Sequence, residues 1–127
     1  MSKAEDLMAL WMDKLEPIRQ TITWNYTTVA VATTKQITIG FSGRVNLHIQ
    51  LDYSGLTVAD ATVKLQRKSI NSAKWVTIPG STTTLTTADD STDWTIIGNV
   101  ADEIRISYTP GTSAACNLAT IYVTAKQ

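Results

Sequence analysis

The chain has 127 residues, of which 43% are hydrophobic and 17% are charged, and its 11 basic and 11 acidic residues leave no net charge. This length suits a single domain with its own core. The charge balance, with no basic run longer than Arg67-Lys68, argues against a nucleic-acid or anionic-membrane partner. The single cysteine, Cys116, excludes an intrachain disulfide.

The N-terminal residues carry two acids, Glu5 and Asp6, and lack the long apolar core of a signal peptide. No apolar run approaches the length of a transmembrane helix. We therefore expect the chain to be made and folded in a reducing cytoplasm.

Residues 2–16 are predicted to form one amphipathic helix. Ser2 suits the N-cap and Glu5 completes a capping-box spacing, while Pro17 disfavours helical geometry at the residue before it and ends the segment. An apolar stripe must be buried, either on the rest of the chain or on another subunit. For Trp11, which belongs to this stripe, we favour burial on a neighbouring subunit. The candidate interface residues on this stripe, at helical steps of three and four, are Leu7, Met8, Trp11 and Leu15.

After Pro17 the apolar period changes to two, which is typical of β-strands. The cleanest alternation covers residues 45–53, and turn pairs such as Pro79-Gly80 and Pro110-Gly111 separate the segments. A slip in the alternation predicts a β-bulge or a corner near Thr27-Thr28. The further strands are predicted around residues 21–26, 29–31, 37–41, 63–67, 75–78, 82–87, 94–97, 104–108 and 119–123.

These short strands, together with 21 threonines, predict an all-β fold. We expect an antiparallel β-sandwich, jelly-roll or immunoglobulin-like, preceded by one N-terminal amphipathic α-helix. Residues 1–17 would form the docking helix and residues 18–127 the sandwich domain. Periodicity does not reveal the strand order, so both topologies stay open.

Residue types that carry catalysis are sparse. His48, the only histidine, lies on the polar side of the cleanest predicted strand, without cysteines or acids at a zinc-ligand spacing. No nucleophile signature accompanies it, so a small hydrolase is the least favoured hypothesis. We expect no enzymatic activity, no cofactor and no metal, although the acidic loop of Asp89, Asp90 and Asp93 leaves a cation site open.

The chain has four tryptophans, whose side chains could pack in the core or contact a ligand: Trp11, Trp24, Trp75 and Trp94. For Trp24, Trp75 and Trp94 we favour a position in the core. An exposed tryptophan on a sandwich can instead stack on a sugar ring, and Trp75 and Trp94 are the candidate stacking residues. Cys116 is expected to be a small buried or half-buried residue near the last turn.

The stretch from about residue 61 to the C-terminus resembles a β-module that recurs in virion proteins of tailed bacteriophages. Such modules have a Q-x-S-x-D-G-x-x-W hairpin and an I-R-[IV]-x-Y strand near their end. This chain departs at the hairpin tip, where Asn71-Ser72-Ala73 replaces Asp-Gly. The resembling residues are 63–69 (VKLQRKS), 74–81 (KWVTIPGS), 93–96 (DWTI) and 103–109 (EIRISYT).

The resemblance implies a non-catalytic structural protein of a phage particle, which decorates the head, forms a head fibre or joins components near the neck or tail. Its partners would be capsid, portal or tail proteins and its own copies, and its location the virion. The N-terminal helix would then dock or self-associate while the sandwich faces solvent. The alternative is a carbohydrate-binding sandwich that recognises a surface glycan during host adhesion.

Overall fold

The computed structural model describes residues 16–26, 31–37, 45–99, 101–112 and 116–127. The predicted helix of residues 2–16, with the candidate interface residues Leu7, Met8, Trp11 and Leu15, lies outside these ranges except for Glu16. Glu16 has no regular secondary structure. The predicted bulge at Thr27-Thr28 also lies outside the described residues.

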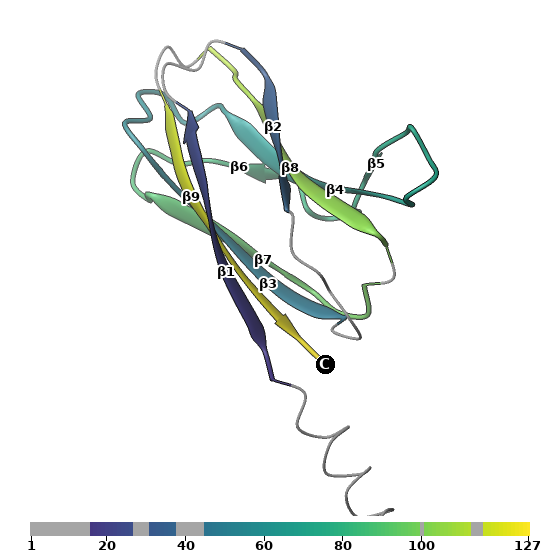
Figure 1. Ribbon diagram of the computed structural model, residues 1–127. Helices are drawn as coiled ribbons and strands as arrows, with labels where there is room; N and C mark the ends of the chain where they lie inside the picture. The colour runs from purple at the N-terminus through teal and green to yellow at the C-terminus, as the bar shows by residue number, and fades with distance from the viewer. Residues whose placement is uncertain (1–15, 27–30, 38–44, 100, 113–115) are drawn as a thin grey trace, which may run out of the picture.

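Nine strands lie within the described ranges, and these ranges contain no helix. They form two antiparallel sheets, which Figure 1 shows as two layers. The first sheet has the order β1 (Ile18–Tyr26), β9 (Asn117–Lys126), β3 (Asn46–Ser54) and β7 (Ser91–Ile96). The second has the order β2 (Thr33–Ile37), β8 (Glu103–Thr109), β4 (Thr62–Lys68) and β5 (Val76–Thr77), and β6 (Thr83–Thr84) also pairs with β4.

One apolar core lies between the sheets. Alternate residues of a strand point to opposite faces, so the period-two pattern gives each sheet one apolar side. Its largest fully buried side chains include Leu47, Ile49 and Leu51 of β3, Leu65 of β4, Ile104, Ile106 and Tyr108 of β8, and Leu118 and Ile121 of β9. Each large apolar side chain in this core stabilises the fold by about 1.5–3 kcal/mol. The prediction of a β-sandwich of two antiparallel sheets is confirmed for the described residues.

The chain repeatedly crosses from one sheet to the other, since β1 and β2, β3 and β4, and β7 and β8 lie in different sheets. The first and last strands pair, with Ile18 opposite Ala125. The start of β1 and the C-terminus therefore lie at the same end of the sandwich (Figure 1).

The pairing of β1 has an irregularity that the apolar alternation of the sequence does not indicate. The pairing of β1 with β9 shifts register between Thr23 and Tyr26, and Asn25 has a φ of 50°. Asparagine tolerates this left-handed conformation better than most residues. The irregularity in the pairing of β1 therefore occurs at Asn25.

Candidate functional site

Trp75 lies on the outer face of the second sheet, carried there by the hairpin between β4 and β5. The guanidinium carbon of Arg105 lies 4.3 Å from the centre of its ring, and the Lys68 ammonium lies 5.5 Å from it. A cation over an aromatic ring contributes about 0.5–1 kcal/mol at an exposed site. Trp75 is half-buried, so the favoured core position is wrong for this residue. Its ring is partly covered by cations.

A polar network continues from this cluster across three strands. Arg105 Nε donates a hydrogen bond of 2.7 Å to Gln66 Oε1, and Lys68 forms an ion pair with Glu103. Glu103 also accepts a hydrogen bond of 3.1 Å from the Gln36 amide. The Lys68 ammonium, as the main cause, lowers the pKa of the Glu103 carboxyl. The network therefore ties the outer faces of β2, β8 and β4 together.

The other two described tryptophans lie in the core, as favoured from the sequence. Trp24 is 9% exposed and Trp94 8% exposed. The indole N–H of Trp94 donates a hydrogen bond of 2.7 Å to the Ser81 carbonyl oxygen. Trp94 therefore has no open ring face for a sugar, and the proposal that it stacks on a ligand is wrong because its ring fills the space between the sheets.

The outer face of the first sheet holds His48. Its Nε2 lies 2.9 Å from Asp93 Oδ2, and the two side chains are 45% and 63% exposed. The neighbours of His48 across the strands are Thr95 and Thr124. Among the described residues no hydroxyl forms a hydrogen bond with the imidazole, and a nucleophile is activated through such a bond. In this geometry the pair is a surface hydrogen bond.

The acidic loop does not converge on one point. Asp89 accepts a hydrogen bond of 3.3 Å from the Thr86 hydroxyl, Asp90 accepts one of 2.9 Å from Tyr53 N through its carbonyl oxygen, and Asp93 faces His48. Within the described ranges no group of three or more histidine, cysteine or acidic side chains could hold a metal ion.

Cys116 is fully buried beside Tyr108, in agreement with the expectation from the sequence. Burial raises the pKa of its thiol and raises the pKa of the Tyr108 hydroxyl to about 12. Both groups are therefore protonated at neutral pH. A buried, protonated thiol is a poor nucleophile.

Sequence reasoning missed one grouping of charges. The sequence shows Arg67-Lys68 only as the longest basic run, whereas the β4–β5 hairpin brings Lys74 to a surface pocket that these two residues also line. The available signal was the turn at residues 71–73, which makes flanking residues neighbours across a hairpin.

The described residues include no helix that could span a membrane. No family model matches the chain, and no curated protein matches it. The chain is similar to a solved structure described as "Bacillus endospore appendages form a novel family of disulfide-linked pili". That likeness has a TM-score of 0.47 and 13% sequence identity, and covers 87% of this chain and 88% of the other.

Proposed function

We propose that the chain is a non-catalytic structural protein of a tailed-phage particle, held by its N-terminal segment while a jelly-roll sandwich faces solvent. The strand orders β1-β9-β3-β7 and β2-β8-β4-β5 favour the jelly roll over the immunoglobulin-like alternative. Jelly rolls also occur in lectins and cupins, so the topology alone does not select the function.

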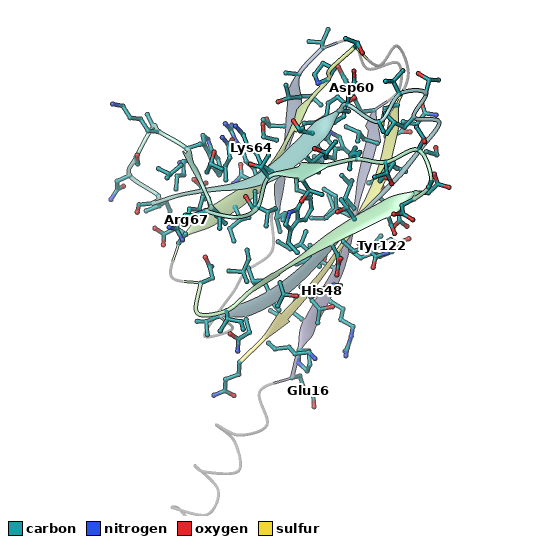
Figure 2. The ribbon with its side chains drawn as sticks, turned by 180° about the vertical axis from the view of Figure 1, so that it is seen from behind. Glu16, His48, Asp60, Lys64, Arg67 and Tyr122 are labelled. Carbon is teal, nitrogen blue, oxygen red and sulfur yellow. The ribbon has the colours of Figure 1, made fainter. Side chains whose placement is uncertain are left out.

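The observation that carries the proposal is the place where residues 2–16 join the sandwich. They lead into β1, which is an edge strand of the first sheet and pairs with β9. Figure 2 places Glu16 at one end of the molecule, beyond the packed side chains of the core. An apolar segment attached at this rim can bind a partner without any loss of core packing.

The positions of the resembling residues in the fold also support the proposal. Its hairpin and its I-R-[IV]-x-Y strand fall on β4, β5 and β8, which are neighbours in one sheet. Within this sheet Trp75 of the hairpin packs on Arg105 of the strand. The residues that carry the resemblance therefore form one packing unit, as expected if the pattern reflects a common structure.

The experiment compares the solution mass of the full chain with that of a variant lacking residues 2–16, by light scattering on a sizing column. We expect the full chain to form a trimer or a larger closed assembly, and the truncated chain to be a folded monomer. Trp11→Asp should act like the truncation, and the surface change Thr21→Asp, on the outer face of β1, serves as its control.

A monomeric full chain that also fails to bind isolated phage capsids, portals or tails would contradict the proposal. Unfolding of the truncated chain, seen as loss of the β-sheet circular dichroism signal, would show that the helix belongs to the core of its own sandwich.

The carbohydrate-binding alternative keeps one observation in its favour, the half-buried Trp75 ring on an outer face. The other exposed aromatic side chain among the described residues, Tyr122 with 44% exposure, lies on the opposite sheet. The two rings cannot form one row along a sugar chain. The alternative therefore depends on Trp75, and loss of binding to a neutral oligosaccharide in Trp75→Ala would support it.

A further inference from the structure

A surface pocket of about 420 Å³ lies beside the β4–β5 hairpin, which projects to one side of the sandwich (Figure 1). Small-molecule sites usually measure about 300–1,000 Å³. Arg67 and Val76 are direct partners across the hairpin and share one face of it. On this face Arg67 extends the row of the buried side chains Val63 and Leu65 beyond the end of the core. Ala101 also lines the pocket at this point.

The pocket is lined by three cations, Arg67, Lys68 and Lys74, and by no carboxylate. Within the described part of the chain, the side chains of Arg67 and Lys74 form no hydrogen bond and no ion pair. Of the two acids beside the hairpin, Glu103 pairs with Lys68, and Asp102 Oδ2 accepts a hydrogen bond of 2.9 Å from Ile70 N. The charges of Arg67 and Lys74 therefore form no ion pair with the described residues.

The backbone around the pocket is held in place by several hydrogen bonds. Ser72 N donates to the Ser69 carbonyl oxygen at 2.9 Å, and Lys74 N donates to Ser72 Oγ at 3.1 Å. Lys68 Nζ donates to the Ser72 carbonyl oxygen at 3.0 Å. A site whose walls are already fixed loses less conformational entropy when a ligand binds.

We propose that this hairpin pocket binds the oxyanion of an acidic sugar, either a carboxylate or a phosphate. The Arg67 guanidinium presents a planar set of donors that matches such an oxyanion, and the Lys74 ammonium adds a second charge. The hydroxyl of Ser69 provides a partner for a sugar hydroxyl, and Val76 and Ala101 provide a small apolar floor. Val76 is 55% exposed, so this floor is open to a ligand.

The test is ligand-observed saturation-transfer NMR with the full chain, which works for a monomer and for a large assembly. The probes are glucuronate and glucose 6-phosphate, with glucose as the neutral comparison and inorganic phosphate as competitor. We expect both acidic sugars, or one of them, to bind at least tenfold more tightly than glucose, and phosphate to displace them. The preferred probe identifies the oxyanion as carboxylate or phosphate.

The double variant Arg67→Gln with Lys74→Gln should weaken this binding at least tenfold. The matched control, Arg19→Gln with Lys64→Gln, removes one arginine and one lysine from β1 and β4 outside the pocket and should bind like the wild-type chain. Equal losses in the two double variants, absence of binding to both acidic sugars, or glucose binding as tight as theirs would each overturn the proposal. So would binding of phosphate alone as tight as that of glucose 6-phosphate.

Discussion

The Arg105 guanidinium packs on the ring of Trp75, at 4.3 Å between the guanidinium carbon and the ring centre. Arg105 lies in β8, and Trp75 directly precedes β5 at the far side of β4. The contact therefore crosses β4 and attaches the projecting hairpin to the outer face of the second sheet. It also places the hairpin pocket in a defined position relative to β8.

Trp75→Ala removes this fastening and leaves the core untouched. We expect a loss of about 1–2 kcal/mol in the free energy of unfolding, from two cation–ring contacts and the buried part of the ring. Urea unfolding measures the loss, and hydrogen exchange should show faster exchange confined to the hairpin. Arg105→Lys keeps the charge and loses the planar contact, so it should show a smaller effect of the same kind. An unchanged hairpin in both variants would contradict the role of this contact.

Trp94→Phe tests the buried hydrogen bond to Ser81. The change keeps an aromatic ring and removes the 2.7 Å donor of the Ser81 carbonyl oxygen, which then keeps only the 3.3 Å hydrogen bond from the Thr83 hydroxyl. The loss of one hydrogen bond of this kind costs about 0.5–1.5 kcal/mol. Trp24→Phe is the matched control, since Trp24 is similarly buried and its indole forms no hydrogen bond among the described residues. Denaturant unfolding should therefore show the larger loss for Trp94→Phe, and equal losses would refute this account.

Tyr108 makes the stability of the fold sensitive to alkaline pH. Its hydroxyl is buried beside Cys116, no other described group bonds to it, and burial raises its pKa to about 12. The unfolded chain releases this proton near the ordinary tyrosine pKa of about 10, and the folded chain retains it, so stability falls as the pH rises between these values. The loss should reach about 2 kcal/mol by pH 12.

Tyr108→Phe removes this proton and should flatten the decline of stability between pH 10 and pH 12, measured by urea unfolding at each pH. Tyr53, whose pKa is also raised by burial, remains in both chains and contributes equally to each. Parallel pH profiles for the two proteins would count against a buried Tyr108 hydroxyl.

Gly111 allows Asp60 to approach the turn after β8. A Cβ at position 111 would lie 2.6 Å from the Asp60 carbonyl oxygen and 2.5 Å from its Cγ. The Asp60 carboxylate accepts hydrogen bonds from the backbone N–H and the hydroxyl of Thr112, so it cannot withdraw without breaking them. Gly111→Ala should therefore cost about 1–3 kcal/mol of unfolding free energy. A melting temperature equal to that of the wild-type chain would contradict this close approach.

Local patterns predicted the strands well where one face is buried. The alternation over residues 45–53 corresponds to β3 (Asn46–Ser54), with Leu47, Ile49 and Leu51 in the core. This success has a simple cause, because side-chain direction in a strand depends only on the position along it. The register shift at Asn25 could not be predicted, because the left-handed backbone of this residue leaves no mark in the apolar pattern.

The sequence by itself determined the β-rich class and the two-faced strands. Only the tertiary structure decided the strand order, the contact of Trp75 with Arg105, and the pocket that joins Arg67 to Lys74. The physical reason is that periodicity reports which face of a strand is buried and carries no information on which strands pair. Each of these features depends on pairing between strands or on the hairpin that follows β4, and such pairing is set by the packing of the whole core.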